Sequence, residues 1–170
     1  CPEEVYVFTP LGDIIELPIG SCVIDFAYAI HTKLGHRCVA AKINQKISSL
    51  STVLESGQTV QVITKPDARP NRSWLEMVAS GKAKASIRFY FKMQHRNDLL
   101  KLGMRMVAKL CHQEVGMEDL PRAVLQKVRH HYRLKHSNEI FEGVALGNLA
   151  AIEVAEKISM EVQHIQLNQK

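Results

Sequence analysis

A short apolar helix set between strand-like segments constrains the fold of this 170-residue chain more than any other feature. Its apolar residues recur at the i, i+3, i+4, i+7 spacing of one helix face: Val23, Phe26, Ala27, Ile30 and Leu34. Asp25 in the first turn favours the start of a helix, and Gly35 favours its end, because glycine readily takes the left-handed C-cap conformation. We therefore expect one amphipathic helix over about residues 23–33.

Segments rich in β-branched and aromatic residues surround this helix. They lie at about residues 5–8, 14–17, 39–43, 46–50 and 59–64. Turn-forming residues separate them, and Asn44-Gln45 predicts a tight turn although Gln is a poor substitute for Gly there. The order ββαβββ suggests a small mixed sheet crossed by the helix, with Phe26, Ala27 and Ile30 buried against it. The ubiquitin-like β-grasp fits this order.

The character of the chain changes after a proline-containing stretch, Lys65–Asn71, which predicts a linker. Beyond it the apolar period is helical, near residues 74–78, 82–96, 97–110, from Pro121, 139–146 and 149–163. The third of these helices would be capped by Asn97 and would turn Leu99, Leu102, Met106 and Leu110 inward. The fold class expected is α+β: a β-grasp domain over 1–65, a linker over 66–73 and an all-α helical domain over 74–170.

Positive charge is concentrated in the middle of the chain. Residues 65–109 carry eleven Lys and Arg against three Asp and Glu, whereas the whole chain has a net charge of +5. Such a segment suggests an acidic or polyanionic partner. Within it, Lys84, Arg88, Lys92 and Arg96 repeat every four residues, and this stripe either is solvated or meets something acidic.

A second cationic group follows the apolar helix, at His31, Lys33, His36 and Arg37. These residues either complement the helix dipole or form an anion-binding edge. Tyr28 lies three residues before His31 and can share its helix face. Beside these cations it could stack a nucleobase, or it could equally pack on the sheet.

Catalytic and metal-binding patterns are missing from the sequence. The four cysteines, Cys1, Cys22, Cys38 and Cys111, form no Cys-x-x-Cys pair, so we expect free thiols, no metal and no cofactor. No apolar run reaches the roughly 18 residues of a membrane span. The chain opens CPEEVYVF, without an apolar leader. We therefore expect a cytoplasmic fragment of a longer polypeptide, without enzymatic activity of its own.

Four passages resemble one known family: VYVFTPLGDIIELPIGS, DFAYAIHTKLGHRCVAAKIN, SGQTVQVIT and ARPNRSWL. They are similar to the TGS domain and following helical domain of the long RelA/SpoT-type enzymes, which make and degrade the alarmone (p)ppGpp in the stringent response. The resemblance is specific over residues 4–96. It implies a β-grasp over residues 4–64. It also implies that the hydrolase and synthetase domains lie upstream, so that this fragment is regulatory.

The resemblance implies two alternative partners. In ribosome-responsive members of the family the TGS domain reads the CCA end of uncharged tRNA, with the histidine of the AY-x-IH motif, here His31, taking part. In SpoT-type bifunctional members it binds acyl carrier protein, a small acidic helical protein. The run from Trp74 directly to Ser80 resembles the SpoT branch, so acyl carrier protein is the first expectation and tRNA on the ribosome the second.

A third alternative is purely intramolecular regulation of the upstream catalytic domains. The residues expected to bind a partner are His31, Lys33, His36, Arg37, Lys42, Tyr28, Arg88 and Lys92.

Overall fold

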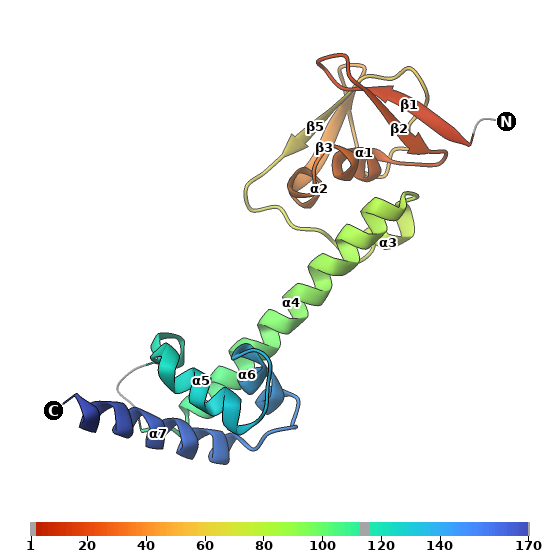
Figure 1. Cartoon of the computed structure of the whole chain (residues 1–170). Helices are drawn as coiled ribbons and strands as arrows, with labels where there is room; N and C mark the ends of the chain where they lie inside the picture. Colours follow the sequence, from red (N-terminus) through yellow and green to blue (C-terminus); the bar gives the residue numbers. More distant parts are fainter. Residues whose placement is uncertain (1–2, 113–115, 170) are drawn as a thin grey trace. The chain divides into compact units, whose positions relative to one another are not determined.

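The computed structural model describes residues 3–112 and 116–169, which divide into two compact units (Figure 1). The first unit ends at Lys92 and the second begins at Met93. The first therefore contains the expected β-grasp segment together with the expected linker and part of the first long helix. The division predicted from the sequence, with a β-grasp domain over 1–65, a linker over 66–73 and a helical domain over 74–170, stays a prediction.

The first unit contains a two-stranded and a three-stranded antiparallel sheet, where the sequence suggested one small mixed sheet. Strands β1 (Glu4–Phe8) and β2 (Ile14–Pro18) form an antiparallel hairpin. Strand β3 (Cys38–Ile43) pairs antiparallel with both β4 (Lys46–Ser48) and β5 (Val60–Thr64). An isolated parallel bridge links Phe8 at the end of β1 to Thr59 directly before β5, and the Phe8 amide donates to the Gln58 carbonyl at 2.8 Å. The β-grasp predicted from the order of elements is confirmed.

The expected single helix is two helices, α1 (Val23–Ile30) and α2 (Thr32–Arg37). His31 separates them with an extended backbone, φ −163° and ψ 141°, and its Nδ1 accepts a hydrogen bond from the Lys33 amide at 3.0 Å. The prediction that Gly35 ends a helix was wrong, because Gly35 lies inside α2. A side chain there would collide with the Tyr28 ring, and only glycine allows this close approach.

Helix α1 is buried on both sides, which explains why its sequence is apolar almost all round. On one side Phe26 packs with Val7 and Val60 in the core under the sheet. On the other side Ala27 belongs to a second core that is shared with residues after the linker. Burial of Phe26 and Ala27 is as predicted, but Ile30 is 41 % exposed, because α1 ends at this residue.

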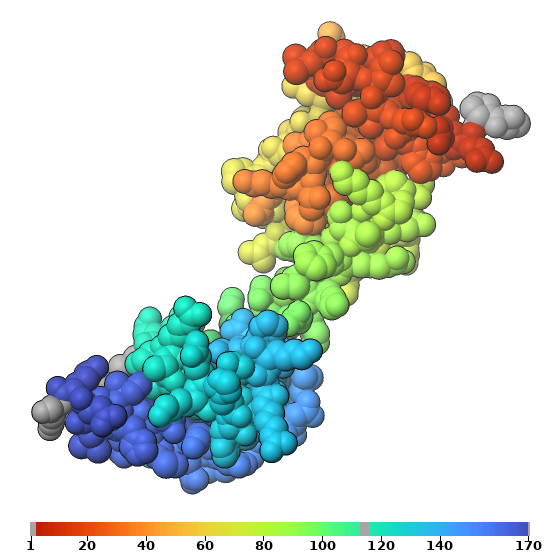
Figure 2. Space-filling view, viewed as in Figure 1, coloured from red at the N-terminus to blue at the C-terminus, as the bar shows by residue number. Residues whose placement is uncertain are grey.

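The second core is completed by α3 (Trp74–Met77) and by the first turns of α4 (Gly81–Ala108). It gathers Cys22, Ile24, Ala27, Tyr28, Cys38, Trp74, Val78, Ala83 and Ile87. In Figure 2 the yellow-green surface of α3 and early α4 lies directly against the orange surface of residues 20–40. Trp74 thus fixes the segment after the linker to the β-grasp domain. Two predicted helices, 82–96 and one from Asn97, are in fact the single helix α4.

The second unit is helical, with the end of α4 followed by α5 (Arg122–His131), α6 (Asn138–Ala145) and α7 (Ala151–Asn168). A 3-10 turn, Met117–Asp119, precedes α5, and Pro121 stands directly before it as expected. The predicted inward face of α4 was wrong. Leu102, Met106 and Leu110 are 39 %, 37 % and 41 % exposed, whereas Val107 is fully buried. The helix turns this other face inward because Gly103, which has no side chain, lies against the Phe141 backbone.

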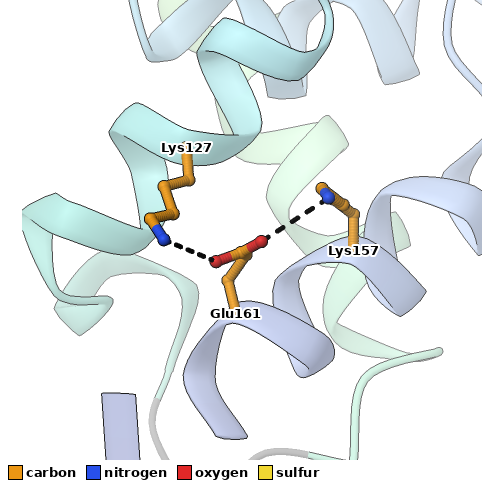
Figure 3. Close-up of polar contacts among 3 residues, drawn as sticks. All are labelled: Lys127, Lys157 and Glu161. Carbon is orange, nitrogen blue, oxygen red and sulfur yellow. Dashed lines mark ion pairs between the residues drawn. The ribbon is translucent and has the colours of Figure 1, made fainter. Parts of the chain in front are cut away.

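A buried carboxylate joins two helices of the second unit (Figure 3). Glu161 of α7 is 7 % exposed and lies between two lysines. Its Oε2 is 3.7 Å from Nζ of Lys127 on α5, and its Oε1 is 3.5 Å from Nζ of Lys157 one turn earlier on α7. The arrangement compensates part of the cost of removing the carboxylate from water.

Three cysteines in the described part of the chain are free: Cys22, Cys38 and Cys111. Burial raises the pKa of Cys22 to about 11 and that of Cys38 to about 12, so both thiols stay protonated and unreactive. The prediction for Cys1 falls outside the described residues. Over residues 3–112 and 116–169, no three potential metal ligands come together and no helix has the length and apolarity to cross a bilayer.

Candidate partner-binding site

One cleft of the first unit brings together half of the residues expected to bind a partner. It has a volume of about 490 Å³, and we call it the cationic cleft. Its lining consists of His31, Thr32, Lys33, His36, Arg37, Ala68, Arg69, Pro70 and Tyr90. Helix α2 and the residue before it form one wall, the linker forms a second, and α4 contributes Tyr90.

Arg37 ties the linker to α2. Its Nη1 donates a hydrogen bond of 2.7 Å to the Ala68 carbonyl, and its own carbonyl accepts one of 3.0 Å from the Lys65 amide. The expected linker is therefore fastened at its start, and Pro70 is buried although its neighbours are exposed. Arg37 both lines the cleft and holds its shape, so a substitution here would change charge and structure together.

His36 is part of an aromatic wall rather than a cation. Its Nδ1 lies 2.9 Å from the Tyr28 hydroxyl, and its ring lies 5.0 Å from the Tyr90 ring. Burial, and secondarily the Arg37 charge, lower the pKa of His36 from its ordinary value of 6.5. The imidazole is thus neutral at pH 7, and His36 contributes shape and stacking to the cleft instead of the positive charge predicted.

Tyr28 lies in the interior of the first unit and is not part of the lining of the cationic cleft. Its side chain has no exposed surface, because it lies between Gly35 and the second core. Burial also raises its pKa, so the hydroxyl is protonated. The hydroxyl shares a hydrogen bond of 2.9 Å with His36 Nδ1, and the tautomer of His36 decides which group donates. The open alternative, that Tyr28 packs in the interior, is what the structure shows.

Three further predicted residues lie outside the cationic cleft. Lys42 is exposed on the outer face of β3 opposite Gln61, where it lines a separate cleft of about 420 Å³. Arg88 and Lys92 are exposed on α4, each two residues from Tyr90. At 3.6 residues per turn, their side chains point roughly 160° away from Tyr90. The sequence could not reveal this, because it contained no sign of which face of α4 meets the β-grasp domain.

Two lining residues escaped the sequence analysis. Arg69 was not predicted because it belongs to the expected linker. Tyr90 was not predicted because the sequence does not show which element its helix packs against. The only signal for Tyr90 was its place three residues after Ile87, which is fully buried at the base of the same helix. Position i+3 lies on a neighbouring part of one face.

The exposed cations of the cleft have no acidic partners among residues 3–112 and 116–169. In the described part of the chain, ion pairs closer than 4.0 Å involve only Arg96, Lys127 and Lys157. Lys33 and Arg69 are exposed and therefore remain available to an anionic group from outside.

A smaller and more apolar cleft of about 360 Å³ shares a wall with the cationic cleft. The shared residues are His31, Lys33 and Arg37, and the additional ones are Ile30, Leu34 and Thr64. The exposed Ile30 at the end of α1 forms part of this surface. Cations and apolar side chains thus stand next to each other on the same edge of the first unit.

Comparisons with known proteins show what the chain is similar to. Residues 5–64 match the TGS domain family. The bifunctional (p)ppGpp synthase/hydrolase SpoT of Escherichia coli K12 is 40% identical over 157 residues, which is 92% of this chain and 22% of that protein. A guanosine-3′,5′-bis(diphosphate) 3′-pyrophosphohydrolase of Vibrio cholerae is 38% identical over 92% of this chain and 22% of its own length. The bifunctional (p)ppGpp synthase/hydrolase RelA of Mycobacterium tuberculosis is 35% identical over 94% of the chain, again 22% of its own length. The chain therefore spans about a fifth of the length of these curated relatives.

Proposed function

Residues 5–64 are a TGS domain, in a chain similar over most of its length to part of the long (p)ppGpp synthases/hydrolases, and we propose that the chain regulates such an enzyme. The relatives' names assign synthesis and hydrolysis to proteins about five times as long. The sequence of this chain offers no nucleophile, base or metal set for either reaction. Its role is to bind a partner in the cytoplasm and pass that state to catalytic domains elsewhere in the same polypeptide.

The partner we propose for the cationic cleft is acyl carrier protein. The observation that carries this proposal is the pairing of unpartnered cations with an adjoining apolar cleft. Lys33 and Arg69 can meet carboxylates of an acidic helical protein, and Ile30 and Leu34 can meet apolar side chains between those carboxylates. Opposite charges speed encounter and fix orientation, whereas buried apolar anchors supply most of the binding energy.

A second candidate, the CCA end of uncharged tRNA, is favoured by the aromatic wall. The Tyr90 ring lies in the cleft beside His36, within reach of the cations Lys33 and Arg69. A ring next to cations is the usual arrangement for stacking an unpaired base whose phosphate is neutralised. Intramolecular regulation of the catalytic domains accompanies either partner.

The two candidates separate in a titration of the 170-residue chain with acyl carrier protein and with a CCA-ended RNA. Lys33→Glu and Arg69→Glu each replace attraction by repulsion without removing an internal hydrogen bond, which Arg37→Glu would do. Since an exposed pair contributes about 0.2–1 kcal/mol, each variant should weaken acyl carrier protein binding severalfold, and added salt should weaken it further. Lys46→Glu, the same charge change on β4 outside the cleft, should have little effect.

Tyr90→Ala distinguishes the mode of binding. Loss of a stacked base costs about 1–3 kcal/mol, so the RNA would lose roughly tenfold or more in affinity. Acyl carrier protein would lose less, because its binding rests on charge and on the neighbouring apolar cleft. If the RNA binds in a Tyr90-dependent way while acyl carrier protein does not bind even at low salt, the first proposal is wrong and the second stands.

A further inference from the structure

We propose that α4 completes the cationic cleft, and that a contact outside the cleft, between Asp25 and Ser80, holds Tyr90 in its wall. Arg69 and Tyr90 are then partner-binding residues although both lie beyond the TGS domain at 5–64. Asp25 and Ser80 act only through Tyr90 and are positioning residues. The consequence for partner binding rests on the function proposed above, whereas the assembly of the cleft does not.

Asp25 is a fully buried carboxylate satisfied by backbone and hydroxyl donors. One oxygen, Oδ2, accepts from the Cys22 amide at 2.9 Å, which caps the start of α1. The other, Oδ1, accepts from the Ser80 amide at 2.8 Å and from the Ser80 hydroxyl at 2.7 Å. The Ala79 amide lies 3.1 Å from both oxygens. Such charge-assisted bonds are roughly twice as strong as neutral ones.

Ser80 connects Asp25 to the start of α4. Its hydroxyl, while donating to Asp25, accepts from the Ala83 amide at 3.2 Å, and its carbonyl accepts from the Lys84 amide at 3.2 Å. Ser80 is therefore the N-cap of α4. Tyr90 lies ten residues further on, about 15 Å along the helix axis at 1.5 Å per residue. The position of Ser80 thus sets the position of Tyr90.

Apolar packing of α4 also helps to hold Tyr90 in the wall of the cationic cleft. Ala83 and Ile87 are fully buried in the second core together with Tyr28. The hydroxyl of Tyr28 holds His36, whose ring in turn meets Tyr90. One buried tyrosine therefore touches both the docked helix and the cleft. If α4 moved away, the cleft would lose the Tyr90 ring and His36 would be exposed to water.

A ligand that contacts both α2 and Tyr90 must favour the docked state of α4, and docking must favour the ligand by the same factor. Binding of a ligand in the cationic cleft would therefore stabilise the position of α4.

The assembly of the cleft can be tested without any ligand, by NMR of the His36 and Tyr90 rings in the 170-residue chain. Asp25→Asn keeps the shape but places amide hydrogens against the donors of residues 79 and 80. The variant should shift both ring signals and raise the His36 titration midpoint towards 6.5, the ordinary value. Ser80→Ala, a milder variant in case Asp25→Asn does not fold, should act in the same direction. Leu54→Ala, a matched control in the core under the sheet, should leave both signals in place.

Partner affinity forms the second arm of the test. Asp25→Asn, although buried outside the cleft, should weaken the partner that binds the wild type by about fivefold or more, and Leu54→Ala should not. If the wild type binds neither acyl carrier protein nor the RNA, the proposed function falls while the ring signals still decide the assembly of the cleft. Wild-type ring signals in both Asp25→Asn and Ser80→Ala overturn the inference.

Discussion

At the scale of single residues, His36 couples the cleft to pH. Burial lowers its pKa in the folded chain, so the unfolded chain takes up a proton at higher pH than the folded chain does. The stability that depends on neutral His36 is complete above about pH 6.5 and is lost as pH falls through the window below it. We expect His36→Gln to reduce the loss of unfolding free energy between about pH 7 and about pH 5.5, as measured by urea denaturation. His95→Gln, at an exposed position, is the control, and equal pH dependence in His36→Gln and wild type would contradict this account.

Gly35 is a residue at which one methyl group decides stability. A Cβ there would overlap the Tyr28 ring, which is fully buried and cannot move aside. We expect Gly35→Ala to lower the unfolding free energy by about 1–3 kcal/mol, as overpacking does. Gly81→Ala is the matched control, because nothing lies within 4 Å of its Cβ in the first turn of α4. That variant should be neutral or more stable. Equal denaturation midpoints for the two variants would show that the Tyr28 ring has room.

At the scale of elements, Glu161 tests what a buried ion pair contributes to the packing of α5 on α7. Lys127→Met removes the cation of α5 and leaves the carboxylate with Lys157 alone, so we expect a loss of about 1–3 kcal/mol. Glu161→Met fills the same space with an apolar chain and frees two lysines that can reach water. Its unfolding free energy should stay within about 1 kcal/mol of the wild type. If urea denaturation shows a larger loss of unfolding free energy for Glu161→Met than for Lys127→Met, the prediction is wrong.

Local patterns predicted the elements better than the contacts between them. The strands, the Asn44-Gln45 turn and the grouping of His31, Lys33 and Arg37 follow from short-range spacing, and all are found. Asn97, by contrast, looked like a helix cap. Its weak helix propensity, a few tenths of a kcal/mol, does not interrupt α4 in a packed structure.

The features that could not be predicted from the sequence depend on packing between residues far apart in the chain. The inward face of α4 was misread because Gly103, which carries no hydrophobic signal, lies where the helix approaches α6 most closely. Tyr90 was missed for the same kind of reason: its role depends on a contact with His36, which is 54 positions away in the sequence. The contact between Asp25 and Ser80 could not be predicted either, since a carboxylate in the first turn of a helix is normally explained by the helix dipole.

At the scale of the whole molecule, the cationic cleft is the one surface through which we propose that a partner acts. The surface combines α2, the linker and Tyr90, and it excludes Lys42, Arg88 and Lys92. The proposed partner would contact α4 through Tyr90, which this helix contributes to the cleft.

The most direct measurement is an NMR map of the isotope-labelled 170-residue chain during addition of unlabelled acyl carrier protein. The account predicts that the shifted amide and side-chain signals cluster at residues 30–37, at 68 and 69, and at Tyr90, and that Lys33→Glu diminishes these shifts. Signals of Lys42 and of the β1–β2 hairpin should stay in place. Shifts centred on the Lys42 cleft or on α7, with residues 30–37 unchanged, would contradict the account.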